Sequence, residues 1–352
     1  MKIFYGVQGT GNGHISRARA MNAELKAAGA EVDYFFSGRA REAYFDMEEF
    51  GQWRSAQGLS FVAEQGQVKL WKTARQNHLW QLWRDIQSLD LSGYDRVICD
   101  FEPITAWAAK RQNIECICLG HQYAFQHKIP IEGDSWLSRT IIKLFAPGSQ
   151  QLGLHWHHFD QPILPPIVHL ETPLPDADKD NGLSQKPEEI LVYLGFEDST
   201  QVLTLLQQFP QMHFVYYGDF TEPSQQGNIR LEPLSVMGFK RDLRQCRGVI
   251  CNAGFELASE AIQLGKPILV KPLHGQMEQL SNALALEALK LGSRMESLSP
   301  NKLNHWLQAD NINGYRYPNV AKAIANWLID PSPISVPELA QSLWRDSDRL
   351  EA

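Results

Sequence analysis

Two side chains in the first third of the sequence, His14 and Asp100, have the types and positions needed for acid–base chemistry. His14 follows the glycine-rich loop Gly9–Gly13, so we expect it at an exposed rim, where an imidazole can take a proton from a hydroxyl near neutral pH. Asp100 ends the apolar run Arg96–Cys99, and a carboxylate beside an imidazole fixes its tautomer. The two residues therefore predict a general base and its orienting partner, although Asp100 could equally cap a helix beginning near Ile104.

The glycine-rich loop and the end of a later strand could contact the acceptor, the molecule whose hydroxyl would lose this proton. Glycines let a backbone approach a ligand closely, and the start of a helix favours an anion. A dinucleotide fingerprint is the alternative, but the spacing here is G-x-G-x-G and not G-x-G-x-x-G. The run ECICLG ends at the same edge of the predicted sheet, where ligands bind. The candidate acceptor contacts are Gly11, Asn12, Gly13, His121 and Gln122. Glu102 is better explained as a helix cap.

The segment from Cys251 to Ala283 carries the strongest pattern in the chain. A strand enters a turn at Gly254, and the amides at the start of the following helix could bind phosphate oxygens. Glu260, inside that helix, could hold two vicinal ribose hydroxyls with its two carboxylate oxygens. The alternative is an ordinary strand–helix unit whose acids face solvent. The candidate donor contacts of this segment, which include sugar-binding residues at the start of the next helix, are Gly254, Phe255, Glu256, Glu260, Glu278 and Gln279.

Short apolar runs alternate with helical patterns through most of the chain, which predicts parallel sheets covered by helices on both faces. In the first half we expect strands over 2–7, 32–36, 96–99 and 115–119, and helices over 15–28 and 104–112. In the second half we expect strands over 190–194, 213–217, 249–252 and 267–270, and helices over 200–208, 256–264 and 279–291. The fold class is therefore α/β, with two doubly wound, Rossmann-like domains that have separate cores and face a central cleft.

Length and proline content predict where the chain divides. A chain of 352 residues exceeds the roughly 250–300 residues at which a single core stops growing. Six prolines and a polar stretch without period lie between residues 161 and 188, as is typical of a linker. We expect a first domain over 1–164, a linker over 165–187 and a second domain over 188–335. Within 336–352, a terminal helix over 337–351 could pack back onto the first domain.

Composition excludes several classes of function. The net charge of -7 argues against general nucleic-acid binding. The five cysteines are odd in number and lack C-x-x-C spacing, so we expect reduced, buried thiols without a metal or redox role. The sequence lacks a signal-peptide pattern and an 18-residue apolar run, which favours a cytoplasmic protein. The D-x-D motif at 176–178 lies in the linker, and the histidines at 155, 157 and 158 lack helical spacing, so neither metal nor cofactor is expected.

Basic and aromatic residues are mixed in two segments, 67–89 and 136–145. Helices of this kind can lie on an anionic membrane surface. Packing in a core and lining of an acceptor pocket are the alternatives. Peripheral contact with the inner face of a membrane is therefore one open expectation.

The block around Gly254 resembles the donor-binding signature of GT-B glycosyltransferases, namely the family 1 UDP-glycosyltransferases and the family 28 enzymes. The shared elements are the glycine turn, the helical glutamate, G-x-P, a proline and E-Q-x-x-N-A. The loop GTGNGH is similar to the family 28 loop, and GTGNGHxxRA, DFEP and GHQ together most resemble a microbial group of family 1-like glycosyltransferases. The resemblance covers about residues 2–125 and 190–295.

This resemblance implies a role for each matching residue. His14 matches the general base and Asp100 its partner, while Gly254 matches the diphosphate-binding turn. Val236 lies, in a loose alignment, where such enzymes hold uracil through the backbone, and Gly195 lies in the counterpart of a glycine-serine loop. Asn252 departs from the family 1 histidine at the diphosphate, which leaves the nucleotide open.

The resemblance implies a metal-independent hexosyltransferase that takes a sugar from a nucleotide diphosphate donor, with UDP as the expected nucleotide. The acceptor would carry a hydroxyl and could be a lipid or an envelope glycan. Two alternatives remain at this point: an enzyme like the UDP-N-acetylglucosamine 2-epimerases, and a nucleotide-sugar binding protein without catalysis.

Overall fold

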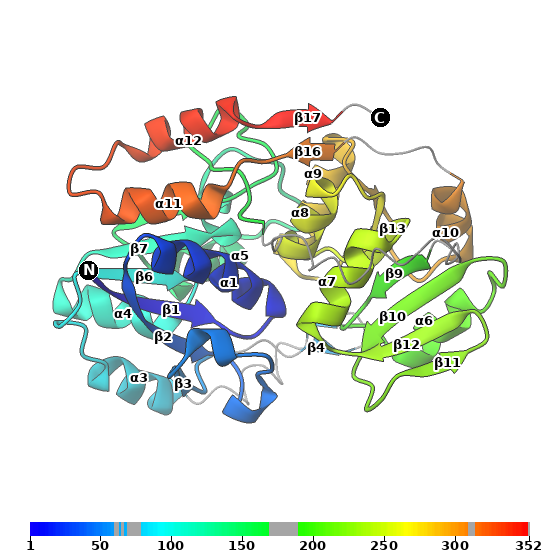
Figure 1. Ribbon diagram of the computed structural model, residues 1–352, viewed down its shortest axis with the longest axis horizontal. Coiled ribbons are helices and arrows are strands. Elements are labelled where there is room, and N and C mark those ends of the chain that lie inside the picture. Colours follow the sequence, from blue (N-terminus) through cyan, green and yellow to red (C-terminus); the bar gives the residue numbers. More distant parts are fainter. Residues whose placement is uncertain (60–62, 65–66, 69–78, 169–188, 309–313, 351–352) are drawn as a thin grey trace.

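Two mainly parallel sheets, each with helices on both faces, build the molecule (Figure 1). The computed structural model describes residues 1–59, 63–64, 67–68, 79–168, 189–308 and 314–350. Most of the predicted linker, the D-x-D motif at 176–178 and the basic-aromatic residues 69–78 lie outside the described residues. The described part contains no helix long and apolar enough to cross a membrane.

The first sheet is parallel throughout, and its inner strands Lys2–Gln8 and Cys116–Gly120 are buried almost along their whole length, as expected for a sheet covered on both faces. In spatial order its strands are β3 (Arg54–Ala56), β2 (Glu31–Ser37), β1 (Lys2–Gln8), β6 (Arg96–Asp100), β7 (Cys116–Gly120) and β8 (Gln150–Gly153). The register pairs Val7 of β1 with Asp100 of β6. Asp100 is thereby brought to the edge from which the glycine loop leaves β1.

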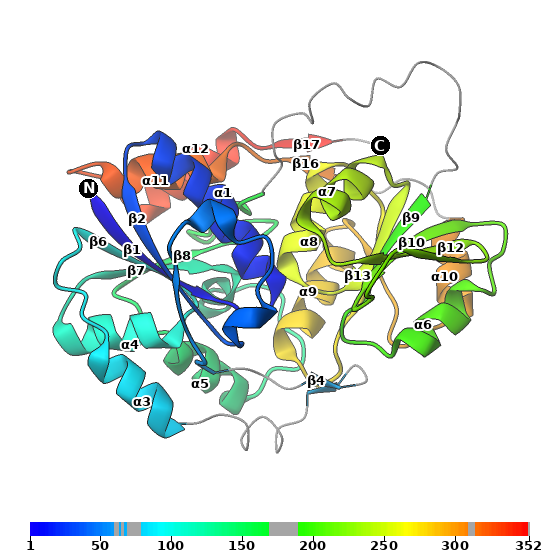
Figure 2. The same ribbon diagram turned by 60° about the horizontal axis from the view of Figure 1, so that its bottom comes forward.

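Helices cover the two faces of this sheet in two groups (Figures 1 and 2). One group consists of α1 (Asn12–Ala27), α11 (Val320–Ile329) and α12 (Val336–Arg345). The other consists of α3 (Leu79–Ser88), α4 (Pro103–Gln112) and α5 (Trp136–Phe145). The predicted strands and helices of this half are confirmed, with ends that differ by up to three residues.

The second sheet is parallel except for an antiparallel edge strand, β11. In spatial order its strands are β11 (Ser224–Gln226), β12 (Ile229–Pro233), β10 (His213–Gly218), β9 (Glu189–Tyr193), β13 (Gly248–Asn252), β14 (Ile268–Lys271) and β15 (Ser293–Arg294). Its helices are α6 (Ser199–Leu206), α7 (Val236–Gln245), α8 (Phe255–Gln263), α9 (Met277–Ala288) and α10 (Pro300–Leu307). The α/β class with two Rossmann-like sheets is therefore confirmed.

The end of the chain returns to the first sheet. Asn319, which caps α11, donates to Glu24 of α1 at 2.7 Å, and Trp344 of α12 donates to the Ile163 carbonyl at 2.6 Å. The prediction of one helix over 337–351 is wrong in its second half. The helix ends at Arg345, and β17 (Asp348–Leu350) pairs with β16 (Gly314–Arg316), because backbone partners distant in sequence are available there.

The prediction of two separate cores is also wrong. One continuous cluster of buried apolar side chains extends from the first sheet through α1 and α8 into the second sheet. Trp156 lies in this cluster, is fully buried, and donates to Ser259 of α8 at 2.8 Å. The two halves therefore share a buried interface beside the cleft that lies between them.

Candidate active site

A cleft of about 550 Å³ lies between the halves, at the carboxyl ends of the parallel strands. It is bounded by the loop after β1, the start of α1 and the starts of α7, α8 and α9. Every predicted site residue except Asp100 lines it: Gly11, Asn12, Gly13, His14, His121, Gln122, Gly195, Val236, Gly254, Phe255, Glu256, Glu260, Glu278 and Gln279. Asp100 lies behind His14 and is fully buried.

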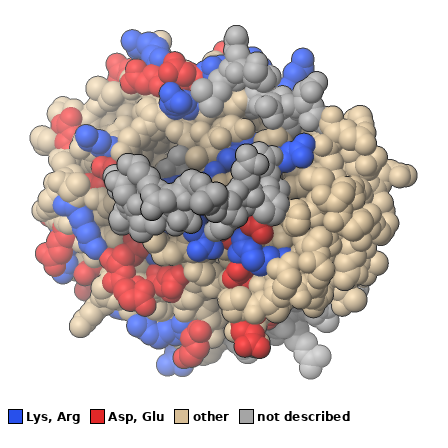
Figure 3. Space-filling model, turned by 45° about the vertical axis from the view of Figure 1, so that its right-hand side comes forward, with Lys and Arg blue, Asp and Glu red and all other residues tan. Residues whose placement is uncertain are grey.

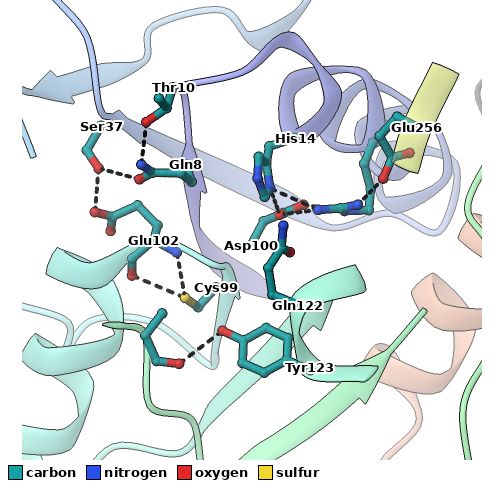
Figure 4. Close-up of polar contacts among 12 residues, drawn as sticks. Gln8, Thr10, His14, Ser37, Cys99, Asp100, Glu102, Gln122, Tyr123 and Glu256 are labelled. Atoms are coloured by element: carbon teal, nitrogen blue, oxygen red, sulfur yellow. Dashed lines mark hydrogen bonds and ion pairs between the residues drawn. The ribbon is translucent and has the colours of Figure 1, made fainter. Parts of the chain in front are cut away.

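His14 and Asp100 are in direct contact. The Nδ1 atom of His14 lies 2.6 Å from Oδ1 of Asp100, and the two side chains face each other in Figure 4. The His14 side chain is 15% exposed and that of Asp100 is 0% exposed, so the imidazole faces the cleft and the carboxylate supports it from the protein side. Helix α4 is capped by Glu102, not Asp100: the Glu102 carboxylate accepts from the Ile104 and Thr105 amides.

Arg17 is a site residue that the sequence analysis missed. It lies one helical turn after His14 on α1, and its guanidinium donates two hydrogen bonds to Asp100, of 2.7 and 2.6 Å. It also donates to Glu256 of α8, across the cleft. Burial acts to raise the pKa of Asp100, but Arg17 and His14 hold it below its usual value. Two signals in the sequence could have indicated it: its spacing of three residues from His14, and its place as the arginine of the motif GTGNGHxxRA.

The predicted ribose ligand Glu260 already has two partners, which the sequence analysis also missed. Ser16 of α1 donates to it at 3.0 Å, and the buried Lys240 of α7 forms an ion pair with it. A donor ribose would therefore share or replace these contacts.

His121 and Gln122 meet α9 across the cleft. The two nitrogens of His121 contact the Leu154 carbonyl at 2.9 Å and Oδ1 of Asn282 at 2.6 Å. Burial lowers the pKa of His121, and its ring stacks on Phe255. The amide of Gln122 donates to Glu278 at 3.2 Å, while its Oε1 is buried and has no partner among the described residues. His121 thus holds the two halves together, and Gln122 keeps a free acceptor atom.

The loop glycines serve two different purposes. A Cβ at Gly13 would lie 2.9 Å from the Glu256 side chain, so α1 can approach α8 only because this residue is glycine. At Gly11 and Gly254 a Cβ would meet nothing within 4 Å. These two positions leave open space in which a ligand could contact the backbone, in accord with the expected binding at a helix start.

The remaining predicted donor contacts have partners of their own. The amide of Val236 donates to Asp46 of the first half at 3.0 Å, so a base would have to compete for this amide. The side-chain oxygen of Gln279 accepts from the Leu273 amide at 2.9 Å. Asn252, beside the Gly195 loop, donates to the Lys271 carbonyl at 3.0 Å.

Among the described residues, one group could hold a metal ion: Cys99, Cys116 and Cys118, whose sulfur atoms lie within 4.8 Å of one another. They are buried in the core of the first sheet and do not line the cleft. Burial raises the pKa of the Cys99 thiol, whereas hydrogen bonds with Cys116 and Cys99 lower the pKa of the Cys118 thiol. All five cysteines are free and buried, as predicted.

Comparison with known proteins assigns the sequence to a family. The model of the family described as glycosyl transferase family 1 matches residues 1–310. No curated protein matches the sequence significantly.

Solved structures resemble the whole fold at low sequence identity. The glycosyltransferase SnogD from Streptomyces nogalater is 17% identical, with a TM-score of 0.54 over 98% of this chain and 99% of its own. The spinosyn rhamnosyltransferase SpnG complexed with thymidine diphosphate is 13% identical, with a TM-score of 0.56 over 98% and 96%. MurG of Acinetobacter baumannii is 15% identical, with a TM-score of 0.51 over 87% and 89%. These likenesses show the GT-B fold.

Proposed function

This chain belongs to glycosyl transferase family 1, and from that premise we propose that it transfers a sugar from a UDP-sugar to a hydroxyl acceptor without a metal ion. The contact between His14 and Asp100 at the floor of the cleft is the observation that carries the proposal. With Nδ1 hydrogen-bonded to Asp100, Nε2 of His14 can accept the proton of the acceptor hydroxyl as its oxygen attacks the anomeric carbon. The carbon–oxygen bond to the diphosphate breaks, and the nucleoside diphosphate leaves with its electron pair.

The second half supplies groups suited to the donor. The free amides at the start of α8, beside Gly254, favour the negative charge that grows on the diphosphate. Glu260 has the geometry for a diol once Ser16 and Lys240 share it. The unpartnered Oε1 of Gln122 suits a hydroxyl of the acceptor or of the sugar.

A lipid or membrane-associated acceptor fits the surface of the first half. Large apolar side chains are exposed on helices α3 and α5, which cover the same face of the first sheet together with α4, and Trp80 is 69% and Trp136 is 79% exposed. The same helices carry the basic residues Arg84, Arg139 and Lys143. We propose that this surface makes peripheral contact with an anionic membrane. On the face drawn in Figure 3, by contrast, acidic and basic side chains are interspersed.

A nucleotide-sugar screen tests the proposal. Binding of UDP-sugars should raise the Tm, since a ligand at 100 times its Kd stabilises by about 2.7 kcal/mol. TDP- and GDP-sugars are the controls for the base. The stabilising donor is then incubated with and without hydroxyl acceptors, and a new glycoside is expected. Release of an epimer from the donor alone would instead identify an epimerase, and binding without turnover would identify a sensor.

A further inference from the structure

Arg17 is a buried cation that contacts both halves of the active site. Three of its nitrogens contact Asp100 and Glu256, and the nitrogen nearest to His14 lies 2.9 Å from Nδ1 of the imidazole. Only 2% of the Arg17 side chain is exposed, so water cannot take the place of Asp100 and Glu256 as hydrogen-bond acceptors for the guanidinium. A displacement of the Arg17 guanidinium would therefore disturb its contacts with both His14 and Asp100.

Two neighbours compete for Nδ1 of His14. Oδ1 of Asp100 lies 2.6 Å from it and can only accept a hydrogen bond from it when the carboxylate is ionised. The guanidinium of Arg17, at 2.9 Å, can only donate. If Nδ1 carries the proton, it donates to Asp100 and Nε2 is free to act as a base. If Arg17 donates to Nδ1, the proton lies on Nε2 and the base is lost.

Arg17 donates two parallel hydrogen bonds to the Asp100 carboxylate, and we call this pair of bonds the fork. The fork decides whether Asp100 or Arg17 bonds to Nδ1 of His14. Bonds from Nε to Oδ2 and from Nη2 to Oδ1 hold the carboxylate in one orientation, with Oδ1 also at Nδ1 of His14. The third nitrogen, Nη1, is drawn to Glu256 in the first turn of α8. Glu256 thus ties the orientation of the fork to the position of the donor half.

We propose that Arg17 is a positioning residue that links the donor half, through Glu256, to the tautomer of His14. The proposal rests on the proposed function, since it concerns the same base. Displacement of α8 relative to α1 changes the contact between Glu256 and Nη1 of Arg17. The guanidinium then shifts, and the hydrogen bond between Asp100 and Nδ1 of His14 changes with it. Burial raises the pKa of Glu256 to about 8, with Arg17 acting against it, and a carboxyl oxygen accepts from Arg17 in either protonation state.

This role for Glu256 differs from the donor contact that the sequence predicts. A donor ligand acts on binding, so its loss would raise the KM for the donor. A partner of Arg17 acts on the base, so its loss lowers kcat while the KM is retained. The two roles are therefore separable by steady-state kinetics.

The kinetic test compares Arg17→Lys, Glu256→Gln and their double variant. Lysine keeps the charge of Arg17 but loses the fork. We expect kcat to fall at least tenfold in Arg17→Lys and less in Glu256→Gln, with the donor KM within about twofold of wild type. The double variant should lose no more than Arg17→Lys alone, because the two residues act as a unit. A raised KM with unchanged kcat in Glu256→Gln would overturn the link.

Arg230→Lys is the matched control. Arg230 makes a comparable fork with Glu189 in the second sheet, at 3.1 and 2.7 Å, and does not line the cleft. Its replacement should leave kcat and KM unchanged, which separates loss of the Arg17 position from loss of any forked ion pair.

A second readout needs no turnover. The ¹⁵N chemical shifts of the His14 ring, assigned by comparison with His14→Gln, report which nitrogen carries the proton. We expect the Nδ1–H form in wild type and a larger share of the Nε2–H form in Arg17→Lys. Identical ring shifts in the two proteins would overturn the positioning role even if transfer is observed. Absence of transfer with a shifted tautomer would refute the proposed function and leave the positioning role standing.

Discussion

At the scale of single residues, the contact between His14 and Asp100 has a kinetic consequence. His14→Ala should lower kcat by about 10²–10⁴-fold, the usual contribution of a positioned base, and should leave donor affinity unchanged. Asp100→Asn should cost no more than His14→Ala, and the double variant should lose no more than His14→Ala alone. Steady-state kinetics over the acceptor concentration provides the measurement.

The structure adds a requirement to this test. Asp100 also holds the buried Arg17, and removing one partner of a buried ion pair costs about 3–5 kcal/mol. Thermal unfolding of Asp100→Asn must therefore be measured first, and rates compared well below its Tm. Fully additive losses would mean that His14 and Asp100 act independently, and a wild-type rate in His14→Ala would remove the proposed base.

Glu260 provides a second residue-scale prediction. Glu260→Ala should weaken UDP binding, because a ribose would lose its paired acceptor oxygens, and Lys240 would also lose its partner. Isothermal calorimetry with UDP measures this effect. Glu287→Ala, an exposed glutamate of α9, is the control and should bind UDP normally. Unchanged affinity in Glu260→Ala would reject the ribose assignment.

At the scale of elements, the start of α8 replaces a metal ion in the proposed mechanism. Its free amides lie beside Gly254, where a Cβ would meet nothing and a phosphate could approach. Transfer should therefore persist at its full rate after dialysis against EDTA. Loss of turnover that Mg²⁺ or Mn²⁺ restores would show that the helix start alone does not offset the charge of the diphosphate.

Helices α3 and α5 carry a prediction about membranes. Replacing Trp80, Trp83 and Trp136 by glutamine should reduce the fraction of protein that sediments with phosphatidylglycerol vesicles, because the apolar area available to the lipid shrinks. Ile334→Gln replaces an exposed apolar residue in the segment between α11 and α12, the helices on the opposite face of the first sheet, and should have no effect. Equal sedimentation of wild type with anionic and neutral vesicles would argue against an electrostatic contribution.

At the scale of the whole molecule, the buried cluster shared by both halves predicts how the protein unfolds. Because the cluster is continuous from α1 to α8, tryptophan fluorescence and far-UV circular dichroism should report one common denaturation transition. Trp156→Ala should lower the free energy of unfolding by about 3–5 kcal/mol. Trp80→Phe, at an exposed site, should change it little. Two separate transitions in wild type would show that the halves fold independently.

Local pattern was sufficient for four strands of each sheet and for five helices, namely β1, β2, β6, β7, β9, β10, β13 and β14 and α1, α4, α6, α8 and α9. Alternation of buried strands with helices is a short-range property, and parallel strands place their carboxyl ends at one edge. For this reason the meeting of His14 with Asp100 could be expected from sequence, as could the placement of Gly254 and Glu260 at the same cleft. Their roles in binding and catalysis, and the domain boundaries around the linker, stay predictions.

Tertiary structure alone decided which partners these residues have. Ser16 looked like an ordinary helix position, and Arg17 stood in a family motif without an assigned role, because their partners Asp100, Glu256 and Glu260 are 83 to 244 residues away in the chain. The same holds for Trp156, whose burial depends on α8. The periodicity of apolar residues indicates that a side chain is buried, but it does not indicate which half of the molecule that side chain packs against. Long-range packing of α1 against α8 therefore decided that the two halves share one buried cluster and that a cation lies between them.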